Sequence, residues 1–350
     1  MIAYLAQAVG SPTPTLVIDA GPLPTTEALL RPVLTTVRRW LADHDQAHVL
    51  KFALVRPSEH PMFDLDYLFV QGLPDGPDQF DFAGSCGHSI LSSVLAADTL
   101  GWLPRLAPGS RARVRVLNNG DHVVCEVDEA RRGSGSFTVH FLQPAGTVLQ
   151  RRLLTGEASD TLVTPAGTYE VSLVTTGNPY VFVDAISLGL TTREALFEAG
   201  DDTYRAMLMI REAAIELLGW PKESVFPKIA AVGSYQPGRI AVRAISVPSW
   251  HPTLALTGAT CLATATAIEG TIPARLLDAA ADDERHAFTI DTPGGTTHVA
   301  ASLCSTAHAA TLDWVSVSGK HAHLHGPAKI TSLSDYAYQE EKPAWQPLSA

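Results

Sequence analysis

The sequence predicts an α+β protein made of two pseudo-symmetric copies of one unit, each with strands wrapped around a central buried helix. Three landmarks recur in one order. A strand-like segment at residues 13–20 returns at 178–185, at an offset of 165, and the strand-opening Lys51 returns as Lys228, at an offset of 177. An apolar helix rich in small residues follows Cys86 and again Thr257, at an offset of 171. Such a duplication predicts an active site in the cleft between the copies.

Length and charge limit the possible classes of protein. A chain of 350 residues exceeds one ordinary core, so we expect an N-terminal domain over residues 1–160, a C-terminal domain over 161–335 and a tail over 336–350. The net charge is −11, and no run of lysine and arginine is longer than two residues. Both features argue against nucleic acid as a partner. No apolar run reaches about 18 residues, so no membrane segment is expected. For assembly, the sequence leaves a homodimer open.

The four cysteines lie far apart, without CxxC or histidine-rich metal spacing. Neither a disulfide framework nor a metal site is therefore expected, and the usage suits a reducing cytoplasm. His321, His323 and His325 alternate as in an exposed strand and are not predicted to bind metal.

The elements follow from local pattern. A helix is expected from Thr26 to about Leu41 and another from Thr203 to Leu218, which stops at Gly219 before Trp-Pro. Strands are expected from their composition and alternation at residues 13–20, 51–55, 112–127, 136–142, 161–174, 178–185, 228–232, 287–290, 297–303, 310–317 and 328–332.

The loop Gly84-Ser85-Cys86-Gly87-His88 runs directly into an apolar helix. Backbone N–H groups at a helix start favour an anion and lower the pKa of a thiol. A carboxylate substrate could sit there beside Cys86, with Ser85, Gly87 and His88 contacting it. For His88, a capping or core role is an equal alternative.

The second copy offers a matching helix start at Thr257, Gly258 and Ala259. We include these residues, with Asn178 and Lys228, among the candidate substrate contacts. Lys228 either mirrors Lys51 or lies on the surface, and Asn178 belongs first to a turn before a strand.

Three motifs together resemble the PrpF family of 2-methylaconitate cis-trans isomerases and related allylic isomerases. They are Lys51-Phe-Ala-Leu-Val-Arg-Pro-Ser58, Asp64-Leu-Asp-Tyr-Leu-Phe-Val-Gln71 and Gly84-Ser-Cys-Gly87. The resemblance implies a diaminopimelate epimerase-like fold and places the family's functional pair on Lys51 and Cys86. In relatives the lysine removes an allylic proton and the carbanion is delocalised into a carboxylate or carbonyl, with no cofactor. An enclosed lysine with a lowered pKa would suit that role.

Two departures from the family concern substrate charge. Where relatives carry an Arg-Gly-Gly-Thr-Ser-Lys-like loop, this chain has residues 8–13 without the cations, and an Arg-Thr-Ala-Arg element is replaced by residues 318–325. Lysine and histidine do not reproduce bidentate arginine contacts with carboxylates. The substrate is therefore expected to be less anionic than a tricarboxylate, such as an intermediate of specialised metabolism.

The predicted function is that of a cofactor-independent C=C isomerase acting on an unsaturated carboxylate or carbonyl compound, by an allylic 1,3-proton shift or by cis-trans isomerisation. The role of Cys86 as acid, base or positioning group stays open. One alternative is a racemase, epimerase or phenazine-type isomerase on the same fold. Another is a catalytically silent binding protein.

Overall fold

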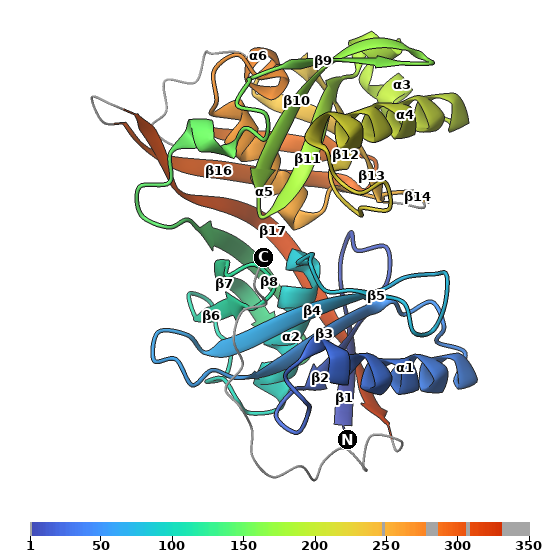
Figure 1. Cartoon of the computed structure of the whole chain (residues 1–350). Helices are drawn as coiled ribbons and strands as arrows, with labels where there is room; N and C mark the ends of the chain where they lie inside the picture. The colour runs from blue at the N-terminus through green and yellow to red at the C-terminus, as the bar shows by residue number, and fades with distance from the viewer. Residues whose placement is uncertain (1, 247–248, 278–285, 306–308, 331–350) are drawn as a thin grey trace. The chain divides into compact units, whose positions relative to one another are not determined.

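The computed structural model describes residues 2–246, 249–277, 286–305 and 309–330, and it divides the chain into two compact units (Figure 1). Unit 1 comprises Met1–His140 and the chain from Gly319 onward, and unit 2 comprises Phe141–Ser318. The predicted tail at 336–350 lies outside the described residues.

Unit 1 wraps strands around α2. Its elements are β1 (Ile2–Ala8), β2 (Thr15–Asp19), α1 (Glu27–Asp43), β3 (Lys51–Pro57), β4 (Leu65–Gly72), β5 (Phe80–Asp81), α2 (Gly87–Thr99), β6 (Arg111–Val116), β7 (His122–Arg131) and β8 (Ser134–Leu142). The strands pair in the order β8, β17, β1, β2, β3, β4, β6, β7. The β2–β3 and β4–β6 pairs are parallel and the others antiparallel.

Unit 2 repeats this plan around α5. Its elements are η1 (Leu149–Arg152), β9 (Asp160–Thr164), β10 (Gly167–Thr176), β11 (Asn178–Asp184), η2 (Ile186–Leu188), α3 (Arg193–Phe197), α4 (Asp201–Leu218), β12 (Lys228–Gln236), β13 (Arg239–Ser246), β14 (Ser249–Trp250), α5 (Leu256–Thr266), α6 (Ile272–Leu276), β15 (Ala287–Thr292) and β16 (Gly295–Ser305). From β10 to β16 the order and sense of pairing match those from β1 to β7.

The repeat extends to single residues. Thr15 pairs with Lys51 in the parallel β2–β3 ladder, and Tyr180 pairs with Lys228 in the parallel β11–β12 ladder. These pairs lie at the offsets of 165 and 177 that the sequence shows. The predicted internal duplication is therefore present in the strand topology.

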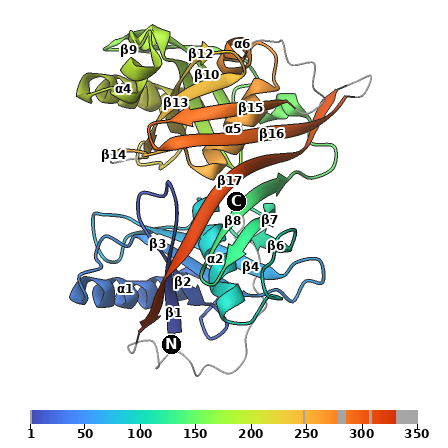
Figure 2. The same cartoon turned by 180° about the vertical axis from the view of Figure 1, so that it is seen from behind.

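The strand β17 (Ala310–Lys329) contributes to both units and appears as one long strand in Figure 2. Its first part pairs with β16 up to Val317, and its later part pairs with β8 and β1 from Lys320 to Lys329. The sequence predicted two separate segments here, at 310–317 and 328–332. The intervening residues complete the strand because two further strands, β1 and β8, pair with them and exchange backbone hydrogen bonds.

The sheet of unit 1 has an outer face, covered by α1, and an inner face, which wraps around α2. Helix α1 packs its apolar stripe, including Leu34 and Val37, against Phe52 and Leu54 of β3. It ends two residues beyond the predicted Leu41, and Thr26 occupies its N-cap without a side-chain cap bond. Successive residues of a strand point to opposite faces of the sheet. Because Phe52 faces α1, Lys51 faces the inner side, toward α2.

Helix α2 is buried along its length from Gly87 to Ala97, as the run of small and apolar residues predicts. Two of its serine hydroxyls bond within the helix: Ser92 donates to the carbonyl of His88 at 3.3 Å and Ser93 to that of Ser89 at 2.8 Å. Helix α5 is buried from Leu256 to Thr266 in the same way. Helix α4 ends at Gly219 in a left-handed conformation (φ 67°), the expected glycine stop.

Candidate active site

Lys51 is the first residue of β3 and is 8% exposed. Its Nζ donates to Ser11 Oγ at 2.7 Å. The Ser11 hydroxyl donates to the carbonyl of Thr13 at 2.8 Å, so its oxygen serves as the acceptor for Lys51 Nζ. The turn between β1 and β2 therefore holds the lysine side chain in one place.

A second polar contact ties the strand beside Lys51 to α2. Thr15, the ladder partner of Lys51, shares a hydrogen bond of 2.8 Å with Ser89 between the two hydroxyl oxygens. Ser89 lies in the first turn of α2, and Cys86 is the N-cap of that helix. The strand β2, which pairs with the lysine strand β3, is thus joined to the first turn of α2 through two buried hydroxyl groups.

Cys86 is half-buried, and its carbonyl accepts hydrogen bonds from Ile90 N at 3.1 Å and from the Tyr67 hydroxyl at 3.0 Å. Tyr67 on β4 is fully buried, and burial, reinforced by the neighbouring Cys86, raises its pKa well above the ordinary value. The phenol stays protonated and acts as a donor. Its donation fixes the backbone at the helix start.

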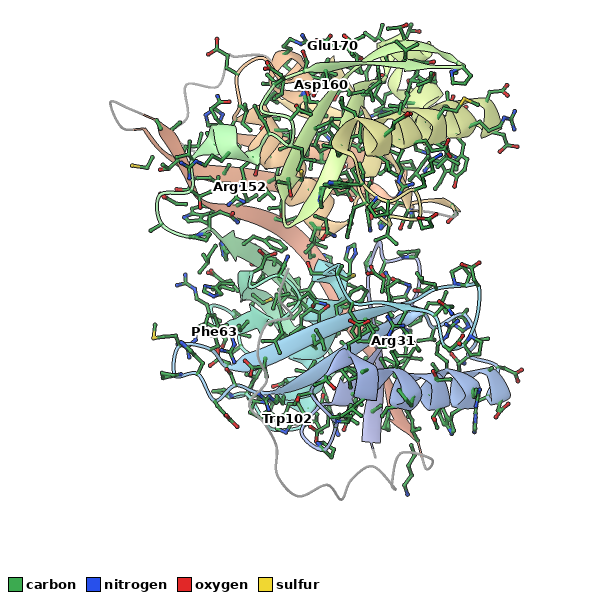
Figure 3. The ribbon with its side chains drawn as sticks, in the orientation of Figure 1. Arg31, Phe63, Trp102, Arg152, Asp160 and Glu170 are labelled. Atoms are coloured by element: carbon green, nitrogen blue, oxygen red, sulfur yellow. The ribbon has the colours of Figure 1, made fainter. Side chains whose placement is uncertain are left out.

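The loop that leads to Cys86 is held from two sides. The Asn118 side chain donates to the carbonyls of Phe69 at 2.8 Å and Phe82 at 2.7 Å. Arg31 of α1, labelled in Figure 3, lies over the Phe82 ring, with its guanidinium carbon 5.3 Å from the ring centroid. This support places Ser85, Cys86 and Gly87 on a fixed backbone path.

The other candidates in unit 1 adjoin Cys86. Ser85 is buried in the loop, Gly87 is the first residue of α2, and His88 is buried as the second. Unit 1 therefore places Lys51 on β3, beside the strand β2 that is hydrogen-bonded to α2, and it places Ser85, Cys86, Gly87 and His88 at the start of α2.

Unit 2 groups the remaining candidates around the start of α5. Asn178 Nδ2 donates to Thr257 Oγ1 at 3.0 Å, and both side chains are buried. Thr257, Gly258 and Ala259 lie in the first turn of α5, which begins at Leu256. Asn178 is also the first residue of β11, so it belongs to the strand as well as to the turn before it.

Lys228 occupies the place in unit 2 that Lys51 has in unit 1. It is half-buried, and its Nζ lies 6.0 Å from the Phe226 ring centroid. Its ladder partner Tyr180 packs so closely on Gly258 that a Cβ there would lie 2.5 Å from the phenol oxygen. Gly258 is therefore required by packing, whatever its contact with a ligand.

Sequence reasoning missed Ser11, Thr15, Tyr67 and Ser89. Their roles depend on contacts across 19 to 74 positions of the chain. The one available signal was position, since Thr15 and Lys51 each open a strand whose next residues form a continuous apolar, buried run.

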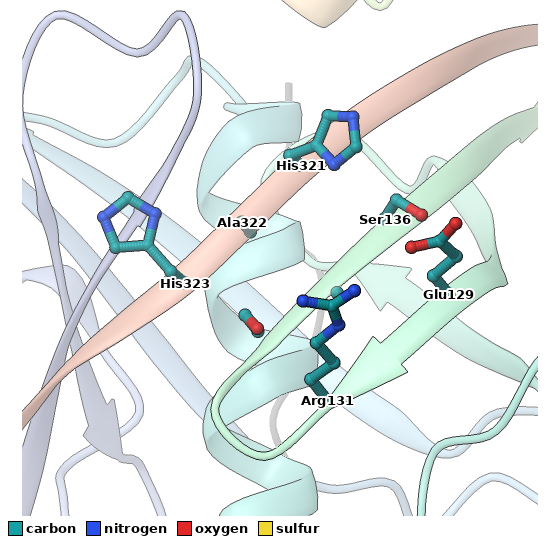
Figure 4. Close-up of a pocket in the computed structure, with 8 residues that line it drawn as sticks. Glu129, Arg131, Ser136, His321, Ala322 and His323 are labelled. Atoms are coloured by element: carbon teal, nitrogen blue, oxygen red, sulfur yellow. The ribbon is translucent and has the colours of Figure 1, made fainter.

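A pocket of about 310 Å³ lies elsewhere in unit 1, between β17 and the β7–β8 segment (Figure 4). Its lining residues are Glu129, Arg131, Ser134, Gly135, Ser136, His321, Ala322 and His323. None of the predicted site residues is among them. Among the described residues, no helix is long and apolar enough to cross a lipid bilayer.

Comparison with known families identifies the chain. The family model described as PrpF protein matches residues 45–321, which is most of the sequence. The chain belongs to the PrpF family. The resemblance carried by the Lys51 and Cys86 motifs is thereby confirmed.

Three relatives of this PrpF family member share a quarter or more of their aligned residues with it. Bacillus subtilis (strain 168) YraM is 28% identical, over 65% of this chain and 71% of its own. The 3-methylitaconate isomerase of Eubacterium barkeri is 26% identical, over 67% and 72%. The 2-methyl-aconitate isomerase of Cupriavidus necator is 28% identical, over 72% and 74%. The chain is an isomerase by family.

Solved structures support the fold. A methylitaconate-delta-isomerase has a TM-score of 0.69 at 20% identity, covering 99% of each chain. A hydroxyproline epimerase from Agrobacterium vitis has a TM-score of 0.62 at 15% identity, covering 94% of this chain and 90% of its own. At these identities the likeness concerns the fold alone, which is epimerase-like as predicted.

Proposed function

We propose that this PrpF family member is a cofactor-independent C=C double-bond isomerase that uses Lys51 as its base. One observation carries the proposal. The buried Lys51 Nζ is held by Ser11 Oγ at 2.7 Å, and β2, the strand beside Lys51, is hydrogen-bonded to the first turn of α2. Two relatives are named 3-methylitaconate isomerase and 2-methyl-aconitate isomerase, and these names support double-bond isomerisation as the reaction class.

The reaction needs one proton removed and one returned. In its neutral form, Lys51 takes a proton from the allylic carbon, so that the C–H bond breaks and its electron pair moves into the conjugated system. The charge is delocalised onto the oxygen of a carboxylate or carbonyl group. Protonation at the other end of the allylic unit by the Lys51 ammonium gives the isomer and restores the neutral lysine, without net oxidation or reduction. If the Cys86 thiol donates this proton instead, the proton held by Lys51 returns to the thiolate before the next turnover.

The start of α2 supplies the electrostatic part of the proposal. The first backbone N–H groups of a helix have no partner within it and carry partial positive charge, so they stabilise a developing enolate. The Tyr67 hydroxyl and the Asn118 side chain hold this backbone before substrate arrives. A fixed donor set loses little free energy to reorganisation during the reaction.

The substrate is proposed to be an unsaturated compound with one or two acidic groups. The turn at residues 8–13 carries no arginine or lysine, although it lies directly against Lys51 through Ser11. Each missing guanidinium removes a charge-assisted contact worth about 1.5–3 kcal/mol. Tricarboxylates should therefore bind poorly.

Two other functions make different demands on the site. A two-base cysteine racemase would need a thiol at each helix start, and unit 2 has Thr257, Gly258 and Ala259 there. Cys261, one turn further, is fully buried and its Sγ donates to the carbonyl of Val174 at 3.1 Å. A silent binding protein would bind ligand without moving protons.

The test is a panel of unsaturated mono-, di- and tricarboxylates incubated in D₂O and followed by NMR. The proposal expects deuterium at an allylic carbon and a shifted or inverted C=C bond for at least one mono- or dicarboxylate. Inversion of a saturated stereocentre would favour a racemase, and binding without exchange would favour a silent protein.

A further inference from the structure

A second pocket in unit 1 lies at the C-terminal end of α2, whereas Cys86 lies at the start of that helix. Its volume is about 670 Å³, a usual size for a small-molecule site. The loop after α2, the turn between β7 and β8, the later part of β17 and Tyr4 of β1 enclose it. None of the candidate active-site residues lines this second pocket.

Two hydrogen bonds hold the walls of the second pocket. Asp98 Oδ1 accepts a bond from Leu106 N at 3.1 Å, which folds the loop back against the end of α2. Leu324 N donates to the carbonyl of Gly133 at 2.7 Å, which ties the β7–β8 turn to β17. The walls are therefore in place before a ligand arrives.

The lining of the second pocket is of two chemical kinds. Its apolar part includes Leu103 and Leu106, which are buried, and Leu324, which is half-buried. Its cationic part consists of three exposed arginines, Arg105, Arg131 and Arg132. An apolar interior with cations at the mouth suits a ligand that has an apolar body and an anionic head.

The three arginines leave the second pocket with an excess of positive charge. In the described parts of the chain, no ion pair involves any of them. Glu129, which lines the first pocket together with Arg131 in Figure 4, is not paired with it. Asp98 is the acidic residue among the lining residues, so their formal charge is 3 − 1 = +2, in a chain whose net charge is −11.

The end of α2 does little to offset this positive charge. Unpaired carbonyls at a helix C-terminus carry partial negative charge. Here the carbonyls of Ala96 and Ala97 accept hydrogen bonds from Leu100 N and Trp102 N, each at 2.9 Å. The cationic lining therefore remains available to a ligand.

We propose that the second pocket binds an aryl phosphate monoester. The phosphate group contacts Arg105, Arg131 and Arg132, and the aromatic ring lies against the apolar lining. A phosphate monoester carries a charge of about −1.5 to −2 near pH 7, which matches the lining, and its oxygens suit the forked guanidinium geometry. A monocarboxylate supplies only one charge. This site is independent of the proposed isomerase reaction.

Calorimetric titration tests the proposal with phenyl phosphate, and with benzoate and inorganic phosphate as comparisons. The proteins are full-length wild type, Arg105→Gln, Arg131→Gln, Arg132→Gln and the triple variant. Arg39→Gln is the matched control, because Arg39 is exposed on α1 of the same unit and lies outside the second pocket. Circular dichroism checks that each variant is folded.

We expect wild type to bind phenyl phosphate saturably and about tenfold or more tightly than benzoate or inorganic phosphate. Each single arginine variant should weaken binding about tenfold, a typical effect of one charge-assisted contact, and the triple variant should lose saturable binding. Arg39→Gln and Lys51→Ala should keep the wild-type affinity.

Three results would overturn the proposal. They are no saturable binding of phenyl phosphate by wild type, equal affinity for benzoate, and undiminished affinity in the triple variant. Binding that is lost in Lys51→Ala but kept in the triple variant would assign the ligand to the candidate active site instead.

Discussion

Thr15 on β2 and Ser89 on α2 share a buried hydrogen bond of 2.8 Å although they are 74 residues apart. Replacing Thr15 by Val keeps its shape but leaves the Ser89 hydroxyl without this partner. A buried polar group that loses its partner costs about 1–3 kcal/mol, so Thr15→Val should lower the free energy of unfolding by that amount. Urea denaturation measures the loss.

A double-mutant cycle with Ser89→Ala isolates this contact. If the hydroxyl pair joins β2 to α2, the second substitution should cost clearly less in the Thr15→Val background than alone. Strict additivity of the two losses would show that the pair is not coupled.

Gly258 is predicted to tolerate no side chain. A Cβ there would lie 2.5 Å from the Tyr180 phenol oxygen and 2.8 Å from Leu254 Cδ1 in a buried environment. Gly258→Ala should therefore destabilise unit 2 by about 1–3 kcal/mol through overpacking. Gly200→Ala is the control, because a Cβ at Gly200 meets nothing within 4 Å. Thermal unfolding that ranks the two variants in the opposite order would contradict the packing argument.

Cys86 should be the thiol that reports on the site. Cys125 and Cys261 are fully buried, and burial raises the pKa of Cys125 to about 12 and that of Cys261 further. Cys304 is exposed, so it is first replaced by Ser. In this Cys304→Ser background, iodoacetamide should label Cys86 in the native protein, and a bound carboxylate should slow the labelling. Mass spectrometry that finds Cys86 unlabelled until unfolding would argue against an accessible site thiol.

Stability should depend on pH through Lys320. Its pKa is about 8 in the folded protein and near 10.5 when unfolded, so the unfolded state binds more protons between these values. The cost of burying the charge is fully present below pH 8 and disappears as the pH rises to about 10.5. Lys320→Met should be more stable than wild type by up to about 3 kcal/mol near pH 7.

That advantage should vanish near pH 10.5 in paired denaturation curves. A constant difference between the two proteins across this range would show that Lys320 does not titrate there.

The fold was largely predictable because the internal repeat is visible in short sequence patterns. The offsets that relate 13–20 to 178–185 and Lys51 to Lys228 reappear as equivalent parallel ladders, and both buried helices follow from their small apolar residues. The position of Lys320 was not predictable. Its burial depends on β17 pairing with β1 and β8, strands more than 170 residues away in sequence.

Within the candidate site, the sequence indicated which residues to consider but not what holds them. Lys51 could have been an exposed strand end, and the structure buries it because the Ser11 turn folds over its side chain. The catalytic roles of Lys51 and Cys86 and the ligand contacts of Asn178, Lys228 and Thr257 stay predictions.

The most direct test of Lys51 as the base is allylic deuterium exchange by Lys51→Ala with the best substrate of the panel. General base catalysis contributes about 10²–10⁴-fold, so exchange should fall by about that factor, while Lys329→Ala exchanges at the wild-type rate. Proton NMR in D₂O measures both rates. Exchange in folded Lys51→Ala within about twofold of wild type, well inside the loss expected for a missing base, would contradict the assignment.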